Sequence, residues 1–192
     1  DCVAWAVGYA AKSYQERLEM NWSLETKNHL FSPSFIYNQI NGGRDGGAYI
    51  YEALDLIVNK GAVTLATMPY NWRDYRTQPS AQAFQEAAKY KAVTWRRTNG
   101  TQSVKAALAE RSPVVIGMWV YSSFNSLRGA NSVYNTTTGG LLGGHAVTIV
   151  GYDDDRYGGA FKIINSWGST NSYSWAPEWR SSWGDNGYFW LP

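Results

Sequence analysis

Apolar residues in the first half of the chain recur every three to four positions, the spacing of one face of an α-helix. Small residues along the first such stretch allow neighbours to approach on several sides, which is typical of a buried central helix. Ser32-Pro33 has the form of an N-cap followed by proline at the first helical position, and Lys60-Gly61 has the form of a C-cap. Four helices are therefore expected, over residues 2–20, 34–40, 49–57 and 80–90.

The second half of the chain contains short runs rich in β-branched and aromatic residues, which predict strands. The expected strands are residues 91–96, 113–120, 146–152 and 160–165, with one helix over residues 103–111. Because the helices come first and the strands follow, instead of alternating with them, the pattern favours an α+β protein. We expect a helical lobe over residues 1–90 that faces an antiparallel β lobe over residues 91–192.

The last two expected strands form a hairpin, because residues 153–159 supply a turn between them. In an antiparallel pair, residues equally distant from the turn lie opposite each other. His145 and Asn165 are each about ten positions from Asp155, near the centre of the turn. If no bulge intervenes, the two residues are predicted to be cross-strand neighbours within hydrogen-bonding reach.

Length and charge set broad bounds. The 192 residues are enough for one large domain or two small lobes with a real core. A formal net charge of +2, with scattered lysines and arginines, argues against a nucleic-acid surface. No apolar run approaches the roughly 20 residues of a membrane span. The chain begins at Asp1 without a methionine, so we expect a piece of something longer and leave its localisation open, with a secreted or cell-envelope location as the working expectation.

Cys2 is the single cysteine and lies at the start of the first expected helix. One cysteine excludes an internal disulfide, and a helix N-terminus favours the thiolate, which is the nucleophilic form. A Cys–His–Asn set provides a nucleophile, a base and a group that orients the base. Cys2, His145 and Asn165 are therefore the candidate catalytic residues, with the Cys2 N–H as an oxyanion donor. No metal or cofactor is expected.

Each of these residues also has an ordinary structural interpretation. A lone cysteine is more often a small buried hydrophobic residue, and an asparagine at a strand end is usually a turn residue. Catalysis is favoured because all three residue types occur in order, at the spacing that the predicted hairpin needs. The second histidine, His29, lies in a polar run and is expected to be a solvated loop residue.

Longer motifs around these residues resemble those of papain-like cysteine peptidases, particularly the disulfide-free bacterial forms. Residues 143–147 resemble the family's catalytic histidine strand, and residues 165–168 read Asn-Ser-Trp-Gly, like the family's asparagine box. Residues 183–188 resemble the Trp-Gly-x-x-Gly-Tyr motif that follows it, and residues 45–47 resemble the segment that lines the substrate cleft. The resemblance covers nearly the whole chain.

This resemblance implies a papain-like two-lobe fold with the active site in the cleft. It also implies a cysteine-type endopeptidase that acts through a thioester acyl-enzyme, with the three candidate residues as its triad. Gly46 and Gly47 would hold the substrate peptide in extended form, and Trp167 would cover the hydrogen bond between the histidine and the asparagine. The expected partners are a peptide or protein substrate and a propeptide or protein inhibitor, and not nucleic acid.

Four features depart from the family's pattern. The oxyanion-hole glutamine precedes the cysteine in the family and is not in this sequence, and Val3 stands where a tryptophan usually follows the cysteine. The disulfides of secreted eukaryotic members are missing, and about a dozen extra residues rich in serine and tryptophan separate Gly168 from Trp183. Two alternatives stay open: a catalytically impaired domain that binds peptides or a partner, and an NlpC-like cell-wall amidase. Such amidases usually place the histidine closer to the cysteine and lack the Asn-Ser-Trp-Gly sequence.

Overall fold

The computed structural model describes residues 1–192, which divide into two compact units, Asp1–Thr98 and Asn99–Pro192. The first unit is helical and the second contains the sheet, so the fold class is α+β as predicted. No helix has both the length and the apolar character needed to cross a membrane.

The helices of the first unit are α1 (Cys2–Ala4), the π-helix η1 (Trp5–Lys12), α2 (Ser13–Met20), α3 (Pro33–Ile40), α4 (Ile50–Asn59), α5 (Ala81–Ala87) and the 3₁₀-helix η2 (Ala88–Tyr90). The second unit contains α6 (Gly100–Ala109), β1 (Val114–Tyr121), η3 (Ser122–Ser126), β2 (Leu141–Asp153), η4 (Arg156–Gly158), β3 (Ala160–Ile164), η5 (Pro177–Trp179) and β4 (Tyr188–Leu191).

The first three helical segments follow one another without a break from Cys2 to Met20, as the apolar periodicity predicted. The absence of a side chain at Gly8 lets α3 approach, because a Cβ there would lie 2.7 Å from Ile36 Cδ1. The run ends at Asn21, whose φ of 52° is incompatible with a further helical turn. The helix that begins at the cysteine is therefore anchored in the core of its unit.

α3 begins where the sequence predicted. The Ser32 hydroxyl accepts a hydrogen bond from the Phe35 N–H at 3.3 Å, and Pro33 is the first helical residue. α4 ends one residue before the Lys60-Gly61 pair, and α5 with η2 occupies the segment expected to be the fourth helix. The loop that contains Gly46 and Gly47 connects α3 to α4.

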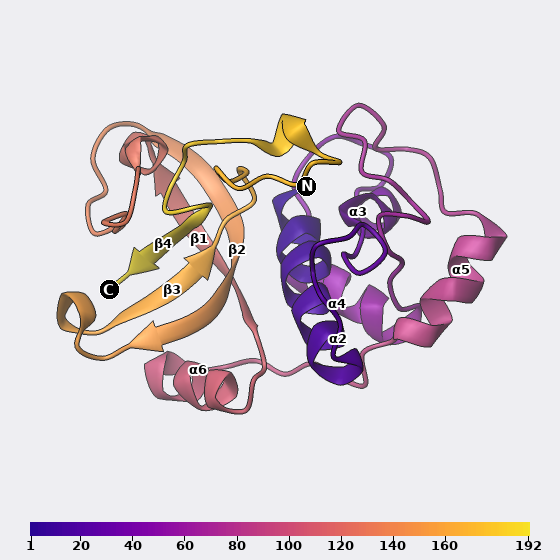
Figure 1. The fold of residues 1–192 in the computed structure, drawn as a ribbon, viewed down its shortest axis with the longest axis horizontal. Coiled ribbons are helices and arrows are strands. Elements are labelled where there is room, and N and C mark those ends of the chain that lie inside the picture. Colours follow the sequence, from indigo (N-terminus) through magenta and orange to yellow (C-terminus); the bar gives the residue numbers. More distant parts are fainter. The chain divides into compact units, whose positions relative to one another are not determined.

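The four strands form one antiparallel sheet in the order β1-β2-β3-β4, so that neighbours in the sequence are neighbours in the sheet (Figure 1). α6 packs against β1 and β2. The core of this unit is built around Phe124, Val147, Ile149, Ile163 and Phe189, which come from η3 and three strands. This packing fixes β2 and β3, the elements that position His145 and Asn165.

Residues 91–96 are not a strand, contrary to the sequence prediction. They do not pair with the sheet and pack against α4 instead. The Ala92 N–H donates to the Ile57 carbonyl at 3.0 Å, and Trp95 Nε1 donates to Asp55 Oδ1 at 2.7 Å. For this reason the division between the two units falls after Thr98. α6 begins three residues earlier than expected, and β4 was not predicted.

Candidate active site

Cys2 is the first residue of α1, and Asp1 precedes it as the N-cap residue. The N–H groups of Ala4 and Trp5 donate to the Asp1 carbonyl at 2.9 and 3.2 Å, so the first helical turn is formed at the thiol. Cys2 is half-buried, whereas Val3 and Ala4 after it are buried in the core. The partial positive charge at the start of a helix favours the thiolate form of a cysteine in this position.

His145 and Asn165 occupy two adjacent strands of the sheet. His145 lies inside β2, opposite Met118 of β1, and Asn165 follows the last residue of β3. Both residues are only 9% exposed. The Asn165 N–H donates to the Gly187 carbonyl at 2.9 Å, which ties the end of β3 to the turn before β4.

The two side chains are hydrogen-bonded, with 2.7 Å between His145 Nε2 and Asn165 Oδ1. The same Oδ1 accepts the Ser166 N–H at 2.8 Å. Because a backbone N–H can only donate, the atom facing Ser166 must be the amide oxygen, and His145 Nε2 must then carry the proton. In a neutral imidazole this leaves the lone pair on Nδ1. The asparagine thus fixes both the ring plane and the tautomer.

The predicted hydrogen bond is present, but the two residues are not directly opposite. β2 and β3 pair with a bulge between Ile149 and Gly151, and Thr148 faces Ile164. Continuing this register places Asn165 opposite Val147, two residues from His145 on the same face of the sheet. The pairing of Asp153 with Ala160 centres the hairpin between residues 156 and 157 instead of at Asp155, and this displaces Asn165 from the position opposite His145. The residue inserted at the bulge shifts the register by one and returns Asn165 to the face of His145, so its side chain reaches its partner diagonally.

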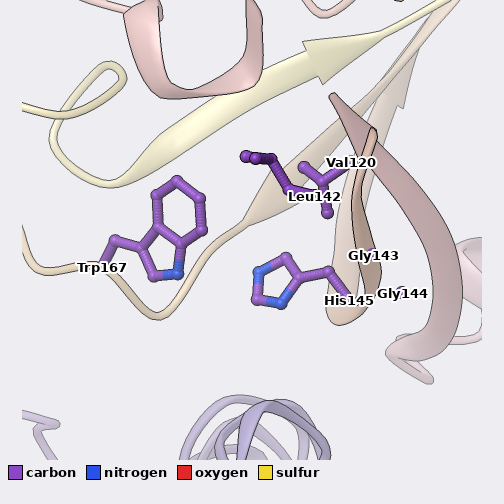
Figure 2. Close-up of a pocket in the computed structure, with 6 residues that line it drawn as sticks. All are labelled: Val120, Leu142, Gly143, Gly144, His145 and Trp167. Carbon is purple, nitrogen blue, oxygen red and sulfur yellow. The ribbon is translucent and has the colours of Figure 1, made fainter. Parts of the chain in front are cut away.

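Trp167 lies beside His145, as Figure 2 shows, with the two ring centroids 5.5 Å apart and the planes inclined at 35°. Phe124 and Trp183 contact the indole edge-on, with centroid distances of 5.1 and 5.4 Å. Trp183 Nε1 in turn donates to the Phe124 carbonyl at 2.9 Å. One side of the indole is therefore packed against fixed aromatic rings, while 36% of the residue stays exposed.

A pocket of about 160 Å³ opens next to the imidazole. It is lined by Val120, Leu142, Gly143, Gly144, His145 and Trp167 (Figure 2). Leu142, which forms part of the lining, is 55% exposed and can contact a bound molecule directly. An apolar side chain fits such a lining better than a charged one.

Two glycines hold the segment after Asn165 against the turn that precedes β4. Gly187 has a φ of 85°, and a Cβ there would lie 2.7 Å from the Gly168 carbonyl oxygen. Gly168 has a φ of 82°, and its Cβ would lie 2.2 Å from the Trp179 carbonyl oxygen. Only glycine combines this backbone conformation with so close an approach. The Asn-Ser-Trp-Gly and Trp-Gly-x-x-Gly-Tyr motifs are therefore neighbours in space, and their contact positions Asn165.

Gly46 and Gly47 are exposed, and the buried Tyr37 of α3 lies beneath this segment. The Tyr37 hydroxyl lies 2.9 Å from Asp45 Oδ1 and 2.8 Å from the Gly46 carbonyl oxygen. Burial is the main cause that raises the pKa of Tyr37; the hydrogen bond from the Gly46 N–H lowers it, and the Asp45 carboxylate raises it further. α1, which begins at Cys2, packs against α3, the helix that carries Tyr37.

The second unit thus brings His145, Asn165 and Trp167 together, and the first unit places Cys2 at the start of a helix that packs against α3. No group of three or more histidine, cysteine, aspartate or glutamate side chains could hold a metal ion. His29, expected to be a solvated loop residue, is partly covered by a stacked Trp22 ring at 4.3 Å.

Two residues that shape these groups were not found from the sequence. The Phe124 ring packs edge-on against Trp167, the tryptophan beside the imidazole, and the Tyr37 hydroxyl binds the glycine segment. Neither is part of a motif, and an aromatic residue inside a helix or a turn is ordinarily read as core. Only the tertiary contacts distinguish them.

Comparison with known proteins identifies the family. The model of the papain family of cysteine proteases matches residues 4–192. The chain belongs to the papain family of cysteine proteases. Among solved structures, this papain-family chain is similar to xylellain, a cysteine protease from Xylella fastidiosa, with 31% identity and a TM-score of 0.78. That match covers 100% of this chain and 72% of xylellain.

Two further similar proteins extend the comparison. An uncharacterized peptidase C1-like protein of Acanthamoeba polyphaga mimivirus is 28% identical over the whole of this chain, which spans 61% of the viral protein's length. Procathepsin B S9 from Trypanosoma congolense has a TM-score of 0.69 at 20% identity, over 98% of this chain and 62% of the other. The second likeness concerns the fold alone. The fold of this papain-family chain is therefore papain-like.

Proposed function

We propose that this chain is the catalytic part of a cysteine-type endopeptidase in which Cys2, His145 and Asn165 act as nucleophile, base and orienting residue. The observation that carries the proposal is the hydrogen bond between His145 Nε2 and Asn165 Oδ1, because it leaves Nδ1 as the proton acceptor. Family membership supports the same class of reaction. The proposal requires the thiol of the first unit to come within reach of Nδ1 in the second.

The reaction begins with transfer of the Cys2 thiol proton to His145 Nδ1. The thiolate attacks the carbonyl carbon of the scissile peptide bond, and the resulting oxyanion is stabilised by N–H donors at the helix start, including that of Cys2. The carbon–nitrogen bond then breaks as Nδ1–H gives its proton to the leaving amine, and a thioester remains on Cys2.

Hydrolysis of the thioester uses the same imidazole as a base. Nδ1 takes a proton from water, the hydroxide attacks the thioester carbonyl, and the carbon–sulfur bond breaks to release the carboxylic acid product. The thiolate recovers a proton from the imidazolium, which restores the starting state. Throughout both steps the Asn165 oxygen stabilises the positive ring through the Nε2–H.

The substrate is a peptide or a protein, and no cofactor takes part. The apolar pocket beside His145 would receive a side chain of the substrate, and Trp167 would shield the histidine–asparagine hydrogen bond from water. Gly46 and Gly47 would lie along the substrate backbone. A propeptide or a protein inhibitor would bind the same surface, because both present a peptide chain to it.

The proposal is tested by treating the folded chain with an epoxysuccinyl peptide, whose epoxide ring is opened by an activated thiolate. We expect one adduct per chain, located at Cys2 by peptide mapping, together with hydrolysis of a dipeptidyl fluorogenic amide. The His145→Ala variant serves as the matched control, because it keeps the thiol but removes the base, so its labelling should slow at least tenfold.

Three results would contradict the proposal. An unlabelled Cys2 in folded protein would exclude it as an activated nucleophile. A labelled Cys2 without any hydrolysis of dipeptidyl or protein substrates would favour the catalytically impaired, peptide-binding alternative. Cleavage of a muropeptide in place of these substrates would favour a cell-wall amidase.

A further inference from the structure

The Tyr37 hydroxyl binds both backbone polar groups of Gly46. It accepts the Gly46 N–H at 3.0 Å and lies 2.8 Å from the Gly46 carbonyl oxygen, to which it can donate. Asp45 Oδ1, at 2.9 Å, is the competing acceptor for the single phenolic proton. One buried side chain on α3 therefore determines how the exposed loop segment at residues 45–47 is oriented.

Because the peptide bond is trans, the contact with the Gly46 carbonyl also sets the direction of the Gly47 N–H. The Gly46 carbonyl and the Gly47 N–H belong to one planar peptide unit, in which they point in opposite directions, and the chain contains no cis peptide bond. Since the Gly46 carbonyl points at Tyr37, the Gly47 N–H points away from it. Gly47 is exposed, so this donor faces outward.

The protein itself does not explain why residues 46 and 47 are glycines. Neither has a φ in the left-handed region, and a Cβ built on either would meet no atom within 4 Å. By contrast, Gly61 and Gly168 have a positive φ and a backbone neighbour that a side chain would strike. The space above Gly46 and Gly47 is therefore open to another chain, whose backbone can approach a segment without side chains.

We propose that Tyr37 is a positioning residue for peptide binding, which orients the peptide unit between Gly46 and Gly47 so that the Gly47 N–H meets a backbone carbonyl of the substrate. The inference rests on the proposed function, since it takes a peptide as the ligand. The position of Cys2 supports it, because α1, which begins at Cys2, packs against α3, the helix that carries Tyr37. Burial also keeps the phenol protonated, as donation to the Gly46 carbonyl requires.

The test compares the parent chain with Tyr37→Phe, which removes the hydroxyl and keeps the ring, on two substrates. A dipeptidyl fluorogenic amide offers a backbone carbonyl to Gly47, whereas p-nitrophenyl acetate offers none and reports only on the nucleophile and base. We expect kcat/KM for the dipeptidyl amide to fall about fivefold, mainly through KM, which is the effect of losing one neutral hydrogen bond. The rate with p-nitrophenyl acetate should change less than twofold.

Tyr90→Phe is the matched control, since it removes the hydroxyl of a partly buried tyrosine of the same unit, whose ring packs on Phe31 and Trp22. It should leave the ratio of the two activities unchanged. An equal loss on both substrates in Tyr37→Phe would mean a merely structural role, and unchanged kinetics on both would mean none, so either result would overturn the proposal. If the parent chain hydrolyses neither substrate, the proposed function itself fails, and the role of Tyr37 in peptide binding fails with it.

Discussion

At the scale of single residues, the chemistry of the candidate site depends on the orientation of one amide group. The Ser166 N–H fixes the Asn165 oxygen, and that oxygen fixes the proton on Nε2 of His145. The asparagine does not carry charge or exchange a proton in this arrangement. Its contribution is to hold the imidazole in one plane and one tautomer, which differs in kind from the contribution of the base.

We therefore expect unequal effects from two alanine variants. Asn165→Ala should lower kcat roughly 10- to 100-fold and leave KM nearly unchanged, because one hydrogen bond to a charged ring is lost in the transition state. His145→Ala should lower kcat at least 1000-fold, since it removes the proposed general base and charge partner of the thiolate. Steady-state kinetics on a dipeptidyl amide measure both, and damage of similar size in the two variants would argue against the assigned roles.

At the scale of elements, the two kinds of glycine in the first unit mark different constraints. Gly61 ends α4 with a φ of 89°, and a Cβ there would lie 1.8 Å from the Ala87 carbonyl oxygen, so both conformation and packing require glycine. Gly47, in the loop between α3 and α4, meets neither constraint. The requirement for glycine at position 47 comes from outside the fold, if a peptide binds there.

A pair of alanine substitutions separates the two constraints. Gly61→Ala should lower the free energy of unfolding by about 2–4 kcal/mol, through left-handed strain and steric overlap at the end of α4. Gly47→Ala should change it by less than about 0.5 kcal/mol but raise KM for a dipeptidyl amide several-fold. Chemical denaturation and steady-state kinetics give the two quantities. A strongly destabilised Gly47→Ala would show that the loop itself needs the glycine.

At the scale of the whole molecule, both units contain tyrosines whose ionisation is opposed by the fold. Burial is the main cause that raises the pKa of Tyr37, Tyr70 and Tyr90 in the first unit and of Tyr188 in the second. Each of these phenols binds its proton more tightly in the folded chain than in the unfolded chain. Unfolding at alkaline pH therefore releases protons, which couples stability to pH.

The expected result is a loss of stability on the alkaline side. The contribution of these groups is fully present below the unfolded-state pKa of about 10 and is lost as pH rises through the higher folded-state values. The free energy of unfolding, measured by urea denaturation at a series of pH values, should fall with increasing slope above about pH 10. Tyr188→Phe should reduce that slope, and a slope identical to that of the parent chain would contradict the assignment for Tyr188.

The helices were predictable because their signals are local. An apolar stripe, the Ser32-Pro33 start of α3 and the Lys60-Gly61 end of α4 each act within a few residues, and the structure places the elements accordingly. β4 and residues 91–96 were not predictable in the same way, because a short run becomes a strand only if a partner edge is available. Tyr188–Leu191 pairs with β3 in the sheet, whereas residues 91–96 bond to α4 of the first unit.

For the candidate site, the residue types and their order could be read directly from the sequence: one thiol at a helix start, a histidine and an asparagine around one hairpin, and glycine motifs beside them. These residue types were recognisable because few side chains can serve as a nucleophile, as a base or as the group that orients the base. Three features required the folded chain: the hairpin register and bulge that make the contact of Asn165 with His145 diagonal, the contact between Gly168 and Gly187, and the hydroxyl of Tyr37 against Gly46. These features depend on how distant segments pack, and packing is set by the whole core and not by any local pattern.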